Sequence, residues 1–406
     1  MLASVLFIGQ ASARPRPLLT GQSAAADVAA TAATNPAGMT RFDKTQVRLD
    51  LYYLQSESTW RENFGSTGFA RVTTTDSDLV VPNIALAKPL SDKWFFGFSM
   101  LGYSISDDYG EAWVGRYVIE EYELVFVSAF PSVAYKVNDN WSVAASLAAT
   151  YTSFTQEKSV FNLPEPGNPN PDDGDLEIDA DGFTAGFGFS TLYEFSDRTR
   201  IGFNYTSELE PDLDGNLDYS NLTSTTEMLL DAAGLLDARV DVDTRSPQKA
   251  NVGVYHEFEN RHAITADINW IDFSRFKLSE IYINGGQVNE SDLDYDDIWT
   301  ISAGYSFPVG DRVVLAVAGI YVSDMVDDDS RQLSLRFDDA WGLGAGIEWR
   351  WSDKWRVDAT IGYTEMGDSP VTTDDIEAIG GPISGRFTDR EFWILQLGLE
   401  WGPGPR

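Results

Sequence analysis

The stretch that decides the fold runs from Trp341 to Tyr363 and reads WGLGAGIEWRWSDKWRVDATIGY. Apolar or aromatic residues occupy every second position from Trp341 to Trp349, and again from Trp355 to Tyr363. Because successive side chains of a strand point to opposite faces, this alternation predicts two strands joined by a turn at Trp351–Asp353. Each run spans about nine to eleven residues, the length that a tilted strand needs to cross a bilayer. Aromatic residues at the ends of each apolar face are typical of the girdles of a membrane barrel.

The composition is compatible with a large membrane barrel. The chain has 406 residues, of which 43% are hydrophobic and 13% are aromatic. No apolar run reaches the roughly 18 residues that a spanning helix requires. A membrane location therefore depends on strands, which leave no backbone group unpaired in lipid only if the barrel closes. The chain contains no cysteine, which excludes disulfides, thiol catalysis and cysteine-based metal centres.

Acidic residues dominate the charge, and the net charge is −34. The carboxylates gather in predicted connections, at Asp172–Asp175, Asp292–Asp297 and Asp327–Asp329. Such a chain should repel nucleic acid, whose binding is dominated by phosphate neutralisation. We interpret these runs as solvated loops, with divalent-cation binding between loops as the alternative. None of the runs has the spacing of an EF-hand loop.

Fourteen segments have the alternation of strands, and an even number is what single-chain bacterial barrels require. They are residues 46–56, 78–89, 93–103, 122–136, 141–157, 176–194, 199–209, 246–258, 262–273, 297–308, 312–323, 339–350, 354–364 and 390–401. We therefore predict an all-β fold, a 14-stranded antiparallel transmembrane β-barrel, over residues 46–401, followed by a short tail at 402–406.

The predicted connections alternate between short turns and long loops. The short turns mostly carry Asp, Asn or Gly, which suit tight turns. Short periplasmic turns and long external loops are the pattern of outer-membrane barrels. Because the number of strands is even and the short turns are periplasmic, both chain ends lie on the periplasmic side. The N-terminal residues can therefore enter the barrel from that side.

The N-terminal residues divide into two parts. Residues 1–13 resemble the end of a secretory signal, because a short apolar part leads to the small residues Ala11–Ala13. Small residues also dominate from Ala24 to Asn35, where the turn-forming pairs Asn-Pro and Ala-Gly begin. We expect residues 14–45 to form a separate segment inside the barrel.

The segment that ends in Asn35, Pro36, Ala37, Gly38 and Met39 resembles the N-terminal hatch of the FadL/TodX family of outer-membrane transporters for hydrophobic compounds. Further stretches resemble family motifs in the family order. They lie within residues 81–98, 130–141, 246–276 and 351–355. The resemblance covers about residues 24–401. It implies fourteen strands, a hatch that plugs the barrel, and a location in the outer membrane of a Gram-negative bacterium.

Small and apolar residues occupy faces that we expect to point into the lumen, which suits a hydrophobic ligand; packing against the hatch is the alternative. A general porin would have a polar, charged lumen. In the longest loop, we predict a short helix over Thr225–Leu236, because threonine begins this stretch and an acidic residue follows in the first turn. The resemblance implies that such loop helices form a first landing site for ligand; a helix that merely covers the rim is the alternative. The expected ligand pathway comprises Met228, Leu229, Val314, Ala316, Ala318, Ile320, Phe392 and Ile394.

A fatty acid would need a cationic partner, because an unpaired charge in an apolar cavity is costly. The candidates are Arg275 and Lys277 at the outer end of one strand, and Lys158 at the outer end of another. Whether the ligand is a fatty acid or a neutral hydrocarbon stays open.

Two prolines, Pro82 and Pro131, lie within predicted strands, where proline removes a ladder hydrogen bond. They could mark bulges or a local defect of the wall. The resemblance implies that a kinked strand opens the barrel sideways, and we place this kink near Gly97–Gly102 and Gly110. Turn formation and room for the hatch are the alternatives for these glycines.

We predict passive, ligand-gated uptake of hydrophobic molecules, long-chain fatty acids first and aromatic hydrocarbons second. No cofactor or metal is needed, and we expect a monomer surrounded by outer-membrane lipid. The alternatives are a general or structural porin and an outer-membrane lipase or esterase. The enzyme would require a histidine base. His256 and His262 are the only histidines, and both lie beside one short turn with Glu259, where we expect interfacial rather than catalytic residues.

Overall fold

The computed structural model describes residues 20–21, 23–63, 69–236, 238–275, 280–284, 286–287, 295–328, 331–333, 338–376 and 381–402. The predicted signal remnant at 1–13 and Lys277 lie outside the described residues.

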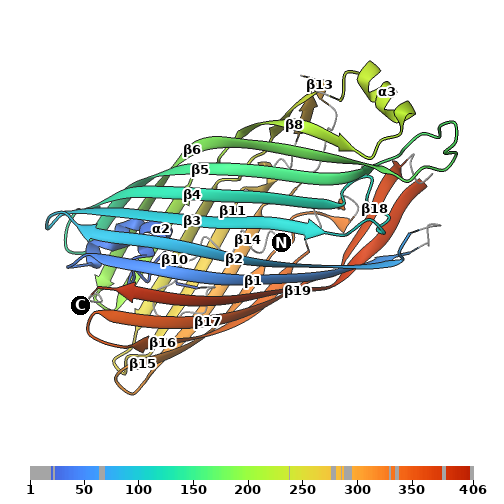
Figure 1. Cartoon of the computed structure of the whole chain (residues 1–406). Coiled ribbons are helices and arrows are strands. Elements are labelled where there is room, and N and C mark those ends of the chain that lie inside the picture. Colours follow the sequence, from blue (N-terminus) through green and yellow to red (C-terminus); the bar gives the residue numbers. More distant parts are fainter. Residues whose placement is uncertain are drawn as a thin grey trace.

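Within the described residues, fourteen strands form a closed antiparallel barrel (Figure 1). Each wall strand pairs with the next, and the last pairs with the first along a register that begins at Val47↔Trp401. The wall strands are β1 (Gln46–Glu62), β2 (Val72–Pro89), β3 (Trp94–Asp108), β4 (Glu121–Lys136), β5 (Trp141–Val160), β6 (Gly174–Ser196), β7 (Thr199–Thr206), β10 (Lys249–Glu257), β11 (Ala263–Ile271), β14 (Ile298–Val309), β15 (Val313–Val322), β16 (Ala340–Arg350), β17 (Trp355–Met366) and β19 (Gly381–Trp401). The predicted fold class and strand number are confirmed.

The alternation in β16 and β17 has the orientation that the sequence predicts. Trp341 and Leu343 are 47% and 58% exposed on the outer face, whereas Gly342 and Glu348 point inward and are buried. Trp355 and Ile361 are exposed on β17 in the same way. The outer face is therefore an apolar surface with aromatic ends, suited to lipid.

Several strands are longer than predicted at the end that carries the long loops, which we call the loop end; the opposite end is the turn end. β1 continues to Glu62 and β5 to Val160, while β19 already begins at Gly381. The outward positions of these extensions are polar, as at Arg61 and Arg386, whereas Trp60, Ile383 and Phe387 are buried inside. Without an apolar outer face, the extensions lack the lipid-facing signal that identifies the other parts of the strands.

The sheet also continues into the long loops through five further strands of the described residues. They are β8 (Asp212–Ser220), β9 (Arg239–Asp243), β12 (Glu280–Ile283), β13 (Gly286–Gln287) and β18 (Ser369–Ile376). The predicted loop helix is present as α3 (Ser224–Ala232), and its N-cap is Thr223, whose side chain accepts a hydrogen bond from Thr226 N. A one-turn helix, η2 (Phe273–Arg275), follows β11. No helix among the described residues is long and apolar enough to cross a membrane.

The N-terminal segment, Thr20–Phe42, contains α2 (Thr31–Thr34) and η1 (Pro36–Arg41). Figure 1 shows α2 among the strands toward the turn end. Most of its described residues are buried, and Met39 and Phe42 pack with Phe95, Ala134 and Leu192 of the wall. The inner face of the barrel is therefore covered here by the chain's own N-terminal residues.

Candidate functional site

The N-terminal segment is held to the wall by hydrogen bonds from its pentapeptide. The Asn35 side chain accepts from Ala37 N and donates to Ser23 O (2.5 Å) and Thr191 O (3.1 Å). Ala37 N also donates to Ser190 Oγ at 3.1 Å. Asn35 thus caps η1 and joins the segment to β6, which fixes how the segment enters the barrel.

Close packing accounts for Gly38. A Cβ atom at this position would collide with Ala26 and Thr31 of the same segment. Pro36 begins η1, where a missing N–H costs nothing, and Met39 is fully buried. The five residues of the predicted hatch motif therefore form one compact turn.

A second set of anchors is a buried group of charges, which we call the charge network. It comprises Arg48 and Asp50 of β1, Glu348 of β16, Arg356 and Asp358 of β17, and Gln396 and Glu400 of β19. Arg48 Nη1 donates to Asp358 Oδ1 at 2.8 Å, and Gln396 Nε2 donates to Asp50 Oδ1 at 2.7 Å. Two arginines face four carboxylates, so the network is net negative.

The charge network binds the backbone of the N-terminal segment. Arg356 Nη2 donates to Asp27 O at 2.9 Å, and Glu400 Oε1 accepts from Ala29 N at 3.2 Å. Arg356 and Glu400 also form an ion pair at 3.0 Å. Burying ions is costly unless they are paired and hydrogen-bonded, and here the barrel wall and the segment supply these partners together.

The interior between this network and the loop end is apolar. We call its buried residues the lumen cluster. It contains Tyr52, Leu54, Val81, Phe273, Tyr295, Ile298, Ala318, Ile320, Val322, Met325, Val326, Ala340, Met366, Phe392 and Ile394. Four predicted pathway residues are therefore brought together, namely Ala318, Ile320, Phe392 and Ile394. Ala316 is buried and Val314 half-buried on the same strand, outside this cluster.

A second apolar group, the mouth cluster, lies toward the loop end. It contains Leu124, Phe126, Phe154, Leu176, Ile178, Ala180, Leu213, Leu217, Ala238, Val240 and Val242. Tyr103 of β3 packs against both clusters, and its ring stacks on Phe126 with centroids 4.6 Å apart. Tyr103 thus joins the two apolar clusters.

The wall has a discontinuity beside Tyr103. The ladder between β2 and β3 covers only Pro89↔Phe95 to Ile84↔Met100, although β2 begins at Val72 and β3 continues to Asp108. Toward the loop end, β2 stays paired with β1 and β3 with β4. We call this unpaired stretch the β2–β3 gap.

The residues at the start of the gap explain where pairing stops. Pro82 has no N–H to donate, and the Asn83 side chain accepts from Gly102 N at 3.2 Å in place of a ladder bond. Leu79 and Val81 of β2 and Tyr103 of β3 border the gap from the lumen cluster. Of the glycines near which we predict a kink, Gly97 lies within the ladder opposite Ala87, and Gly102 lies beside the gap. Gly110 lies beyond β3, in the following loop.

The predicted basic residues lie in different surroundings. Arg275 is half-exposed and pairs with Glu208 at 3.3 Å. Lys158, at the loop end of β5, is half-buried opposite Leu176 of the mouth cluster, and among the described residues no carboxylate forms an ion pair with it. Lys158 thus differs from Arg275 in having an apolar neighbourhood and a free charge.

Three other cations at the loop end form ion pairs. Arg331 is buried and donates to Asp324 Oδ2 at 2.9 Å. Burial raises the pKa of Asp324, and Arg331 opposes that rise. Further pairs of the same kind are Arg116–Asp173 and Arg245–Glu210.

The two predicted loop residues lie on the surface. Met228 and Leu229 of α3 are 63% and 50% exposed. Helix α3 projects from the loop end, well away from the lumen (Figure 1). Their side chains therefore face solvent, ahead of the mouth cluster.

Each of the two histidines forms a hydrogen bond with one hydroxyl group. His256 Nδ1 lies 2.8 Å from Thr199 Oγ1, and His262 Nδ1 bonds to the Tyr305 hydroxyl. Both contacts lie at the turn end, among aromatic neighbours such as Phe258.

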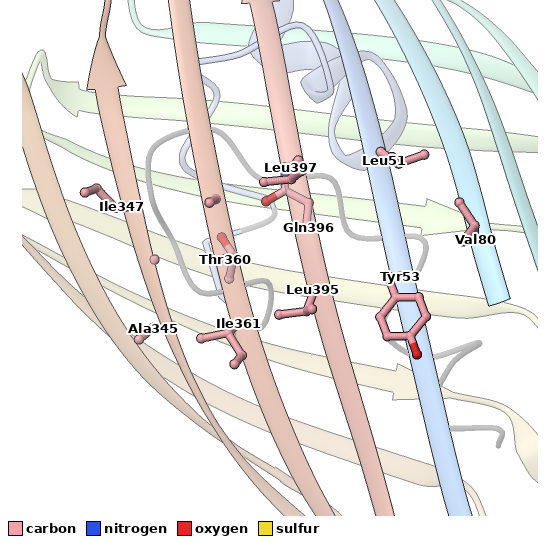
Figure 2. Close-up of a pocket in the computed structure, with 12 residues that line it drawn as sticks. Leu51, Tyr53, Val80, Ala345, Ile347, Thr360, Ile361, Leu395, Gln396 and Leu397 are labelled. Carbon is pink, nitrogen blue, oxygen red and sulfur yellow. The ribbon is translucent and has the colours of Figure 1, made fainter. Parts of the chain in front are cut away.

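A groove of about 550 Å³ lies on the outer wall across β1, β2, β16, β17 and β19. Figure 2 shows its side chains, among them Ala345, Ile361 and Leu395. The exposed members belong to the lipid-facing set, and the small Ala345 between larger neighbours makes the hollow. The groove is part of the lipid-facing surface and is separate from the lumen cluster.

Sequence reasoning missed the charge network and the rim of the gap. Arg48, Asp50, Arg356 and Asp358 occupy inward positions of strands whose outer faces are apolar. Charged residues at the inward-facing positions of these strands could therefore have indicated a buried network from the sequence. The β2–β3 gap had a weaker signal, Pro82 together with Gly102.

Comparisons with known proteins agree with this architecture. A family model described as "Outer membrane protein transport protein (OMPP1/FadL/TodX)" matches residues 11–399. The chain is 24% identical to a long-chain fatty acid transport protein of Salmonella typhi, over 85% of this chain and 83% of the relative.

Two solved structures share the fold. A FadL homologue of Pseudomonas aeruginosa superposes with a TM-score of 0.85 at 19% identity, covering 97% of each chain. The toluene transporter TodX of P. putida gives a TM-score of 0.67 at 15% identity, covering 95% of this chain and 98% of that one.

Proposed function

Because the chain belongs to the OMPP1/FadL/TodX family of outer-membrane transport proteins, we propose that it admits hydrophobic molecules passively and releases them sideways through the β2–β3 gap. Family members are transporters of hydrophobic compounds rather than enzymes, and they reside in the outer membrane of Gram-negative bacteria. The observation that carries the proposal is an apolar interior that reaches the wall where the ladder is interrupted.

The route begins at the loop end. Met228 and Leu229 offer exposed apolar surface for a first contact, and the mouth cluster offers a buried continuation. Tyr103 joins the mouth cluster to the lumen cluster. Each step moves apolar surface of the ligand away from water, which favours entry by about 25 cal/mol per Å².

The N-terminal segment serves as the hatch in this proposal. Its contacts with Thr191, Arg356 and Glu400 cover the inner face toward the turn end. A ligand that fills the lumen cluster changes the packing beside the charge network, which binds the hatch backbone at Asp27 and Ala29. Gating follows if ligand binding favours a second arrangement of these anchors.

Long-chain fatty acids are the first candidate ligands, with Lys158 as carboxylate partner. Its ammonium forms no ion pair with the described residues, and its stem lies beside the mouth cluster. The carboxylate of a fatty acid can therefore bind the ammonium while the apolar tail contacts the mouth cluster. Arg275 is the weaker candidate because Glu208 already neutralises it. Aromatic hydrocarbons, which need no cation, are the second candidate, since the same apolar route serves them.

The direct test is uptake of labelled oleate and labelled toluene by cells with and without this protein. We expect faster uptake of both compounds in cells that contain it. Equal uptake in the two cell types would remove the transport function. Conductance of small ions without hydrophobic uptake would favour a general porin. The account requires one chain only, so we expect a monomer, which sedimentation in detergent can test.

A further inference from the structure

The lower rim of the β2–β3 gap carries polar groups without partners. Asn83 and Ser99 adjoin the last ladder pair, Ile84↔Met100, and point to the inner face. Asn83 Nδ2 and Ser99 Oγ have no hydrogen-bond partner in the part of the chain that the structure describes, and the two residues are only 2% and 0% exposed. Buried polar groups are almost always satisfied, so two unsatisfied groups beside one wall defect require an explanation.

A third polar group lies next to them. The Tyr52 side chain of β1 is fully buried in the lumen cluster, and its hydroxyl lies beside the Asn83 side chain. Tyr52, Asn83 and Ser99 thus place polar atoms from three successive wall strands at one edge of the gap.

The electrostatic surroundings select the kind of head that these groups would bind. Asp50 lies directly opposite Asn83 in the ladder between β1 and β2. Asp50 belongs to the charge network, whose two arginines are engaged by carboxylates and by the hatch backbone. Neither arginine of the charge network is therefore free for an anionic head, and burying an unpaired charge here would be costly.

We propose that Tyr52, Asn83 and Ser99 form a polar subsite at the rim of the gap that binds a neutral hydrogen-bonding head, such as an alcohol or a protonated carboxylic acid. The tail then lies along Leu79, Val81 and Tyr103. The three groups together can donate to and accept from a hydroxyl. This inference rests on the proposed transport and adds a selection: neutral amphiphiles pass the rim, and permanent anions do not.

The test compares three labelled compounds with the same chain length: dodecan-1-ol, dodecane and dodecane-1-sulfonate. Uptake is measured in cells with the full-length protein and corrected for cells that lack it. We expect the alcohol to enter at least about tenfold faster than the sulfonate, because the sulfonate must bury an unpaired charge. Equal uptake of the alcohol and the sulfonate would overturn the inference.

Matched variants locate the subsite. Asn83→Leu and Ser99→Ala should lower uptake of the alcohol about fivefold to tenfold relative to uptake of dodecane, as expected for a lost hydrogen bond. Ser302→Ala is the control, because Ser302 Oγ on β14 is equally buried and unsatisfied but lies on another part of the wall. Ser302→Ala should change neither rate.

The outcomes separate the two proposals. If Asn83→Leu and Ser99→Ala leave alcohol uptake as fast as in the unmodified protein, the subsite is wrong while transport stands. If Ser302→Ala lowers alcohol uptake as much as Ser99→Ala does, the subsite is also wrong. If the unmodified protein admits neither dodecane nor the alcohol, the transport function fails, and the subsite with it.

Discussion

At the scale of single residues, two arginines and one lysine near the loop end differ in whether a carboxylate neutralises them. Arg275 and Arg331 pair with carboxylates, whereas Lys158 stands beside apolar side chains without an ion pair in the described residues. An arginine that is already paired gives little to an incoming carboxylate, because the ligand must compete with the existing partner. We therefore propose Lys158 as the residue that distinguishes carboxylic acids from hydrocarbons.

Replacing Lys158 by methionine keeps the apolar stem and removes the charge. We expect Lys158→Met to weaken oleate binding at least about tenfold, since a hydrogen bond to a charged group contributes about 1.5–3 kcal/mol. Toluene binding should stay within about twofold, because no charge is involved. Titration calorimetry of the purified protein measures both. Lys354→Met, in an exposed turn, is the control, and an unchanged oleate affinity in Lys158→Met would remove this role.

At the scale of elements, the strands were readable from the sequence and the irregular contacts were not. The alternation in Trp341–Tyr363 identifies β16, β17 and the turn between them, because the membrane imposes one period on both faces. The strand extensions beyond the lipid band and the pairing of β18 with β19 lack that constraint. Long-range contacts such as Asn35 with Thr191 depend on the closed barrel, which no local pattern encodes.

The hatch is the element with the clearest structural test. Asn35→Ala removes the cap of η1 and the hydrogen bonds to Ser23 O and Thr191 O. We expect the opening free energy of the N-terminal segment to fall by about 1–3 kcal/mol, so that its amides exchange with solvent at least tenfold faster. Hydrogen exchange with mass spectrometry reports this change. Asn168→Ala, in an exposed loop, should have no effect, and equal exchange in both variants would show that Asn35 does not anchor the hatch.

Helix α3 is the element that we assign to ligand capture. The double change Met228→Ser and Leu229→Ser removes its exposed apolar surface while the Thr223 cap remains. The half-saturation concentration for oleate uptake should rise about threefold to tenfold, with an unchanged maximal rate, because only the first contact weakens. Leu90→Ser, equally exposed at the turn end, is the control. A lower maximal rate with the same half-saturation would contradict a capture role.

At the scale of the whole molecule, the net charge of −34 acts on any charged ligand. Repulsion between the protein and an oleate anion slows association, and salt screens it over a Debye length of about 10 Å at 0.1 M. We expect the association rate of oleate with the purified protein to rise severalfold between about 0.01 M and about 0.15 M salt. Toluene serves as the neutral control and should show no such change. Stopped-flow binding checks both, and an oleate rate that falls with salt would mean that local cations outweigh the global charge.

The arrangement of the molecule as a whole joins three features that no single element contains. The barrel closes through β1 and β19, the N-terminal segment covers its interior toward the turn end, and the ladder is interrupted between β2 and β3. We therefore propose that the β2–β3 gap is the route from the lumen cluster to the membrane.

The chain has no cysteine, so a cysteine pair across the gap can be joined selectively. Val80→Cys on β2 and Ser104→Cys on β3 flank the gap beyond the last ladder pair, and a short bifunctional thiol reagent with a reducible link closes it. Ala345→Cys with Ile361→Cys, which face each other on β16 and β17, is the control pair. Our account predicts that the link across the gap abolishes uptake of labelled oleate, that reduction restores it, and that the control link has no effect. Full uptake with the gap linked would contradict release through the wall.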